Sequence, residues 1–186
     1  MAPRRRRILS AAALSFFALW SNFVAAAAVL PSLEYAVKAT FLYKFAPFVE
    51  WPDGSFGSAS SPLVICVVGN DPVGGMIDQV ALGQRIGERA IEVRHLQSVG
   101  RQSGCHILYI AQPDAPSAMQ AANAVRGTPV LTVSDMARGA GAPCIVRFVV
   151  QNNKVTFDID NAAAAESQLA ISSRLLSLAR SVRPKP

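Results

Sequence analysis

Apolar and polar residues recur along the chain with two different periods, which predicts a mixture of helices and strands. From 33 to 49 the apolar residues are spaced at three, four and seven, the pattern of a helix, and Pro52 stops that pattern. The continuous apolar run at 63–68 is typical of a strand buried on both faces of a parallel sheet. Asp71 then stands at the expected N-cap of a helix over about 73–82.

The remaining segments continue the alternation. Three more strands are expected, at 90–95 near the sheet edge, at 106–110 and at 128–133. Helices are expected over 116–125 and 161–182. The arms of an antiparallel hairpin are expected at 144–150 and 154–159, around Asn152-Asn153. This order predicts an α/β fold: a single three-layer domain whose mostly parallel central sheet ends in an antiparallel C-terminal hairpin, with helices on both faces.

The first 28 residues have the composition of a secretory signal peptide. Four arginines, Arg4 to Arg7, precede an apolar run that ends at Trp20, and Ala25 to Ala28 supply small residues for cleavage. An uncleaved membrane anchor is the alternative, but the run is shorter than the ~20 residues that span a bilayer. The sequence therefore predicts a signal peptide at 1–28 and one domain at 29–186.

Removing that segment changes the charge of the protein. The 186-residue chain carries a formal charge of +6, and without the four terminal arginines 14 basic residues remain against 12 acidic ones. Nucleic acid is therefore not an expected partner, since the basic character lies in the leader. No second apolar run approaches spanning length, so the mature chain is expected to be soluble and exported.

Export allows disulfides to form, and the chain has three cysteines. Cys66 and Cys105 are expected to pair, because both belong to apolar strands of one sheet and the segment between them contains one complete helix and one strand. Cys144 would then be the odd thiol, either buried and inert or joining two subunits. A Cys105–Cys144 bridge would contradict this assignment.

The residues needed for catalysis or metal binding are scarce. His95 and His106 have no partners at zinc spacing, and no G-x-S-x-G motif is present, so we expect no catalytic residue, metal or cofactor. Asp158 and Asp160 share a strand face and could form an acid pair, but a strand end leading into a helix cap is favoured.

The turn after the first long strand is a candidate small-ligand site. Asn70, Asp71 and Gly74 lie where a helix N-terminus could bind a small anion, although the turn lacks both the dinucleotide and the Walker motifs. A capped turn without a ligand is the favoured interpretation.

The first and the last predicted helices each carry more apolar residues than one packing face can bury. The first predicted helix is apolar almost all round, which indicates deep burial or a partner surface, and the last one carries leucines off its main stripe. The candidates for partner binding are Phe41, Phe45, Trp51, Leu169, Arg174 and Leu176. The alternative is that the two stripes pack on each other or in a homodimer.

Several segments resemble the YfiR family. They are the helix 35–50 with its Trp51-Pro52 ending, the strands 64–69 and 105–110, and the segments 131–135, 155–161 and 169–176. The resemblance spans essentially the whole mature chain. Some relatives carry a second cysteine shortly after the one matching Cys144, where this chain has Val150, Gln151 and Asn152.

The resemblance implies a periplasmic regulator. Such a protein binds the periplasmic portion of an inner-membrane diguanylate cyclase and represses it, lowering cyclic di-GMP and with it biofilm and exopolysaccharide output. An outer-membrane OmpA-like lipoprotein relieves the repression by sequestering the regulator. Family members are also reported as dimers and as redox-responsive through disulfides.

Three function classes therefore compete. A non-catalytic binding module that represses a membrane enzyme leads, because of the export signal, the lack of catalytic clusters and the resemblance. A periplasmic small-molecule sensor or carrier that uses the Asn70 turn is the alternative, and an exported hydrolase comes last. An adjacent gene for a membrane cyclase would favour the first class, and a transporter gene the second.

Overall fold

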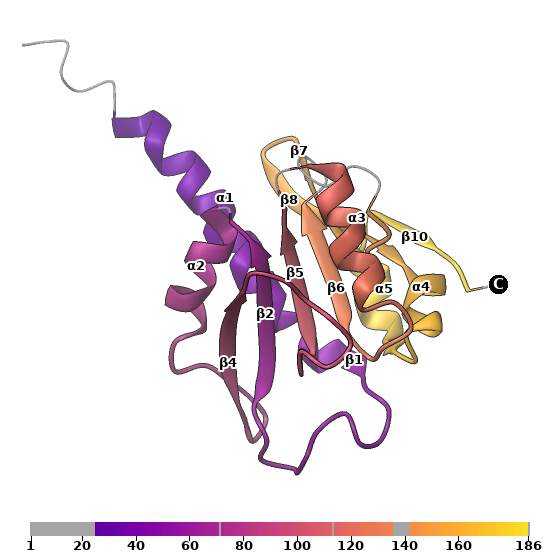
Figure 1. Cartoon of the computed structure of the whole chain (residues 1–186). Coiled ribbons are helices and arrows are strands. Elements are labelled where there is room, and N and C mark those ends of the chain that lie inside the picture. Colours follow the sequence, from indigo (N-terminus) through magenta and orange to yellow (C-terminus); the bar gives the residue numbers. More distant parts are fainter. Residues whose placement is uncertain (1–24, 71, 113, 136–141, 186) are drawn as a thin grey trace, which may run out of the picture.

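An eight-stranded sheet forms the centre of the protein (Figure 1). The computed structural model describes residues 25–70, 72–112, 114–135 and 142–185. In spatial order the strands are β10 (Ser181–Arg183), β8 (Lys154–Asp160), β7 (Val146–Gln151), β6 (Leu131–Asp135), β5 (Ile107–Ala111), β2 (Leu63–Gly69), β4 (Arg89–Leu96) and β3 (Arg85–Ile86). Strands β4, β2, β5, β6 and β7 are mutually parallel, whereas β7 and β8 form an antiparallel hairpin. The α/β fold with a mostly parallel sheet is thus confirmed.

Helices cover both faces of this sheet. Helices α1 (Ala25–Lys44) and α2 (Pro72–Ala81) pack on one face, against the side chains of β2 that include Ile65 and Val67. Helix α3 (Ala115–Ala124) packs on the other face, where Val64 and Val68 of the same strand point. Because β2 alternates between two separate cores, its uninterrupted apolar sequence is explained.

Helix α1 ends earlier than the apolar spacing predicts. It stops at Lys44, and the chain continues through the short 3-10 helix η1 (Ala46–Phe48) into strand β1 (Val49–Glu50). Pro47 lies inside η1 and has no N–H to donate, so a continuous helix to 49 would lose a hydrogen bond there. Most of the expected signal peptide lies outside the described residues, and no described helix is long and apolar enough to span a bilayer.

The predicted helix over 161–182 is wrong. The chain instead forms α4 (Asn161–Glu166), β9 (Ala170–Ile171), α5 (Ser173–Leu178) and then β10. Gln168 has a φ of +58°, which no helix contains, and Ser172 caps a new helix by accepting a hydrogen bond from the Leu175 N–H. The apolar spacing resembled one helix because the segment from α4 through β9 to α5 presents Leu169, Ile171 and Leu175 to the same core, whereas Leu178 is 61% exposed.

Strands β1 and β9 join distant parts of the chain in a second, two-stranded sheet. Val49 pairs with Ile171 and Glu50 with Ala170 in antiparallel register. The Ser172 N–H also donates to the Phe48 carbonyl oxygen over 2.9 Å. The segments that follow α1 and α4 are therefore held side by side.

The β7–β8 hairpin turns at the expected residues. Asn152 and Asn153 have φ values of +51° and +58°, and Gln151 pairs with Lys154 directly across the turn. Two consecutive positive φ angles are characteristic of the type I′ turn that favours asparagine. The hairpin prediction is confirmed.

Candidate functional site

Four phenylalanines pack together beneath helix α1. The Phe45 ring lies 5.1 Å from Phe157 and 6.0 Å from Phe148, and the Phe41 ring lies 5.7 Å from Phe45. Phe45 is only 1% exposed, so it cannot meet a partner and its assignment as a contact residue is corrected. Phe41 is half-buried, and its partner role stays a prediction.

Leu169 is also a core residue, at 2% exposure. Its N–H donates to the Ala164 carbonyl oxygen over 2.9 Å, in the turn that ends α4, and this turn directs the side chain inward beside Leu175. The expectation that Leu169 lies on a surplus surface stripe is corrected by this turn. Leu176 is half-buried against the same core, so the stripes of the first and last segments do pack on a shared core.

One surface beside this core combines exposed charged side chains with half-buried aromatic rings. We define the β1–α5 surface as Phe48, Glu50, Trp51 and Arg174, which lie on β1, at its ends, or on α5. The Arg174 guanidinium is 5.8 Å from the centre of the Phe48 ring. Arg174 and Glu50 are exposed, and among the described residues neither has an oppositely charged group within ion-pair distance. This surface can therefore bind a partner through both charge and apolar contact.

Trp51 connects the β1–α5 surface to the loop that follows. It is half-buried, with its ring edge against Phe56 at 5.8 Å. Its buried Nε1 atom has no hydrogen-bond partner among the described residues. Trp51 also packs against the apolar core and lies 6.4 Å from the His106 ring, and its partner role stays a prediction.

A buried ion-pair network, not anticipated from the sequence, attaches α1 to the end of β6. Lys38 is 1% exposed, and its Nζ lies 2.5 Å from both Asp135 Oδ2 and Glu34 Oε1. Burial by itself lowers the pKa of Lys38, but the hydrogen bonds and charges of Asp135 and Glu34 outweigh it, so the pKa is raised overall. A lysine within an otherwise apolar helical stripe was the available sequence signal.

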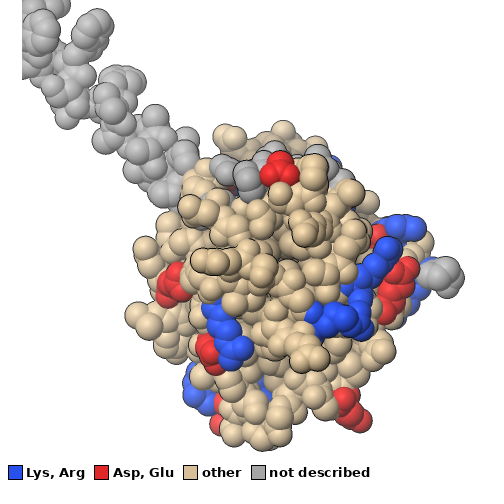
Figure 2. Space-filling model, in the orientation of Figure 1, with Lys and Arg blue, Asp and Glu red and all other residues tan. Residues whose placement is uncertain are grey.

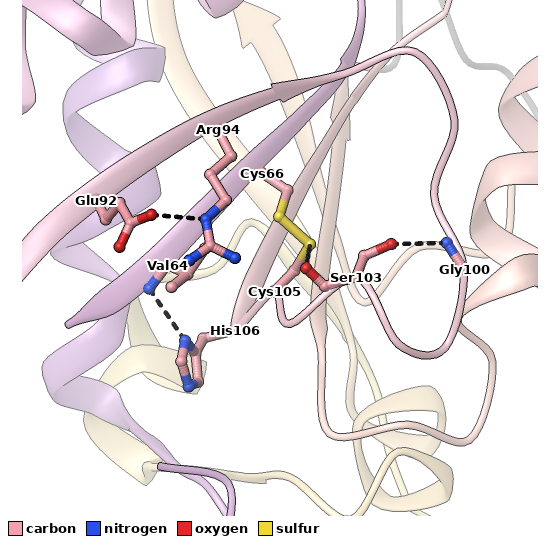
Figure 3. Close-up of a disulfide and its surroundings, with 8 residues drawn as sticks. All are labelled: Val64, Cys66, Glu92, Arg94, Gly100, Ser103, Cys105 and His106. Atoms are coloured by element: carbon pink, nitrogen blue, oxygen red, sulfur yellow. Dashed lines mark hydrogen bonds and ion pairs between the residues drawn. A yellow bond between two sulfur atoms is a disulfide. The ribbon is translucent and has the colours of Figure 1, made fainter. Parts of the chain in front are cut away.

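The predicted disulfide is present. Cys66 of β2 and Cys105, just before β5, are bridged with their Cα atoms 5.7 Å apart. Figure 3 shows Arg94 and Glu92 of β4 beside the bridge, with the Arg94 Nε donating to Glu92 over 2.6 Å. Cys144 is free and buried, and burial raises the pKa of its thiol. The thiolate, which is the reactive form, is therefore disfavoured.

The turn after β2 is closed by main-chain contacts. The Asn70 N–H donates to the Ala111 carbonyl oxygen over 3.2 Å, and Gly69 has a φ of +93°. Gly74 is buried within α2, and Asp71 lies outside the described residues. The donor at Asn70 is thus occupied, and ligand binding at this turn stays a prediction.

A groove lies between α1 and the β7–β8 hairpin. This groove has a volume of about 540 Å³ and is lined by Leu33, Glu34, Val37, Val150, Asn153, Lys154 and Val155. Nothing among the described residues covers it. No local pattern predicts this groove, because its two walls are more than a hundred positions apart in the chain.

Asp158 and Asp160 are each paired with an arginine. Asp158 accepts two hydrogen bonds from Arg180, at 2.8 and 2.5 Å, and Asp160 accepts one from Arg183 while capping α4 at the Ala163 N–H. On the face shown in Figure 2, basic and acidic side chains lie next to one another on the side where Figure 1 places β10 and α4. The carboxylates are therefore structural, as the favoured interpretation holds.

The comparisons identify the family. The model of a family described as YfiR/HmsC-like matches residues 35–180. No curated protein was found to match the chain. Within the described residues no group of three or more His, Cys, Asp or Glu side chains could hold a metal ion.

Proposed function

The chain belongs to the YfiR/HmsC-like family, and we propose that it represses an inner-membrane diguanylate cyclase by binding that enzyme's periplasmic portion. The family implies a periplasmic regulator of diguanylate cyclase. In this proposal repression is exerted by docking and not by turnover, and it lowers cyclic di-GMP and biofilm output. Removal of residues 1–28 during export would deliver the domain to the periplasm.

The β1–α5 surface supports this proposal, and the exposed Arg174 carries it. A guanidinium that lies over an aromatic ring is partly pre-ordered, so it loses less freedom when it binds a carboxylate. Arginine and aromatic residues are also enriched among the residues that dominate binding energy. The surface therefore fits a partner element that presents a carboxylate beside an apolar side chain.

Two further partners follow from the family and not from the geometry. An outer-membrane OmpA-like lipoprotein would relieve repression by competing for the regulator, and a homodimer is a further possible assembly. Both remain proposals. A lipoprotein that competes for the same surface would also depend on Arg174, which makes the same variant informative for both partners.

Charge reversal at Arg174 tests the docking surface. Arg174→Glu should weaken binding to the cyclase's purified periplasmic portion by about 10- to 30-fold, the size expected for an interface arginine. Cellular cyclic di-GMP should then rise towards the level of a deletion strain. The side chain is exposed, so thermal stability should stay within about 0.5 kcal/mol of wild type.

Arg126→Glu is the control, because Arg126 is 65% exposed, is not one of the four residues of the β1–α5 surface, and has a long 3.8 Å contact with Glu166. It should leave both binding and cyclic di-GMP unchanged. Unaltered binding by Arg174→Glu would remove the β1–α5 surface from the proposal. Unchanged cyclic di-GMP and biofilm in a deletion strain would refute the regulatory function itself.

A further inference from the structure

Both ring nitrogens of His106 are engaged in a way that requires the neutral imidazole. The Val64 N–H donates to Nδ1 over 3.0 Å, so Nδ1 is an acceptor and carries no proton. Nε2 lies 3.0 Å from the Ser55 carbonyl oxygen and therefore donates its proton to it. Protonation at Nδ1 would place two N–H groups against each other and break the Val64 contact.

The same ring holds the loop between β1 and β2. Phe56 stacks on His106 with ring centres 4.1 Å apart and planes 8° apart. Arg89 lies over the Phe56 ring at 3.8 Å and donates to the Ser58 and Ser61 carbonyl oxygens. With the Ser55 contact, these interactions attach the segment 52–62 to the body of the domain.

The charges around His106 oppose its protonation. Burial is the main cause that lowers its pKa below the usual 6.5, and the positive charges of Arg89 and Arg94 lower it further, against a smaller opposite effect of the Ser55 contact. Arg101 and His106 both line a cavity with a volume of about 260 Å³, so Arg101 adds a third positive charge near the ring. Of the nearby carboxylates, Glu92 is paired with Arg94 and Asp53 is exposed.

We propose that His106 is a proton-sensitive latch for the loop 52–62. The neutral ring ties the loop to β2, because it accepts from Val64 and donates to Ser55. The imidazolium cannot accept from Val64, so the ring leaves β2 with Ser55 still bound to Nε2 and Phe56 still stacked on it, and the loop is no longer attached there. Trp51 contacts both the Phe56 ring, at 5.8 Å, and the His106 ring, at 6.4 Å, so the edge of the β1–α5 surface changes with pH when the His106 ring moves. This device goes beyond docking on a cyclase and does not depend on that function.

The sign of the pH dependence follows from the lowered pKa. The open state binds a proton more readily than the closed state, so the closed state is fully favoured above about pH 6.5 and loses its advantage as the pH falls. The ratio of open to closed loop rises by at most about tenfold for each pH unit below 6.5, because one proton is bound on opening.

Trp51 reports on the latch because its ring lies 6.4 Å from the His106 ring and 5.8 Å from the Phe56 ring. The other tryptophan is Trp20, in the expected leader, so the processed protein, or the whole chain carrying Trp20→Phe, has Trp51 as its only tryptophan. Its fluorescence should change between pH 7 and 4.5 with a midpoint below 6.5, while far-UV circular dichroism stays constant. His106→Asn should abolish the change, since an amide oxygen can still accept from Val64 but does not titrate in this range.

His95→Asn is the matched control, because His95 is exposed and contacts only Asp78, at 2.8 Å. The Trp51 fluorescence of the His95→Asn variant should change with pH as that of the wild type does. Proton NMR of the wild-type His106 ring should give the same midpoint as the Trp51 change, which keeps the test valid if His106→Asn does not fold. A His106 midpoint at or above 6.5, midpoints that differ by more than one pH unit, or a fluorescence change retained in His106→Asn would each overturn the latch.

Discussion

Replacing Lys38 by methionine tests the ion-pair network that holds α1 on the sheet. Methionine has a similar length and a good helix propensity, so the change mainly removes the charge. It leaves the Asp135 carboxylate, whose side chain is 9% exposed, without its cation. Glu34 is less affected, because its side chain is 34% exposed and can be hydrated.

The expected cost follows from these exposures. Removing one partner of a buried ion pair typically costs 3–5 kcal/mol, and we expect about 3 kcal/mol because Asp135 keeps other contacts. For a domain of this size that corresponds to about 6–12 °C in melting temperature. Because the pKa of Lys38 is raised on folding, its stabilisation is complete below pH 10.5 and is lost only as the pH rises through the higher folded value.

The assay is urea unfolding of Lys38→Met, Asp135→Asn and the double variant at pH 7. Once Lys38 is absent, Asp135→Asn should cost little or even stabilise. The double variant should therefore lose about 2 kcal/mol less stability than the two single losses added together. Lys44→Met is the control on the same helix: Lys44 is exposed, and its loss should change stability by under about 0.5 kcal/mol. A loss below 1 kcal/mol for Lys38→Met, or additive single effects, would refute the reasoning.

Two further changes test the main chain and the bridge. The double variant Cys66→Ala/Cys105→Ala opens a loop with a sequence separation of 39 and should lose about 4 kcal/mol, measured by urea unfolding against the oxidised wild type; equal stabilities would contradict a structural bridge. Gly69→Ala would place a Cβ 2.4 Å from the Ala111 carbonyl oxygen at a φ of +93°, so we expect a loss of about 2–4 kcal/mol. Gly75→Ala in α2, where a Cβ meets nothing within 4 Å, should instead raise stability by about 0.5–1 kcal/mol, and a loss at both glycines would argue against the close approach at Gly69.

The parts of the fold that depend on local chemistry could be predicted from the sequence. The strand at 63–68 is apolar at every position because both of its faces are buried, and the Asn152-Asn153 pair specifies its own turn. The prediction of one helix over 161–182 was wrong because the apolar spacing there suits one long helix as well as two short ones. Ser172 was an available cap signal, but nothing local marks Gln168 for a positive φ.

The candidate site was less predictable, because it depends on contacts between distant segments. Phe41 and Phe45 belong to one apolar stripe, and only the packing of Phe148 and Phe157 shows which of the two is fully enclosed. The Lys38–Asp135 contact spans 97 positions, so no local pattern reveals it. His106 likewise acquires its role from Ser55 and Phe56, which precede it by about fifty residues.

The pairing of β1 with β9 sets an order for folding. Val49 is synthesised early and Ile171 late, so the small sheet cannot form until almost the whole chain is present. Such long-range pairing must overcome the entropy of closing a loop of 122 positions before any contact compensates for it, which slows the final step of folding. A chain emerging one segment at a time therefore keeps β1 without its partner strand until almost all of the chain is made, even though α1 can already pack on β2 and α2.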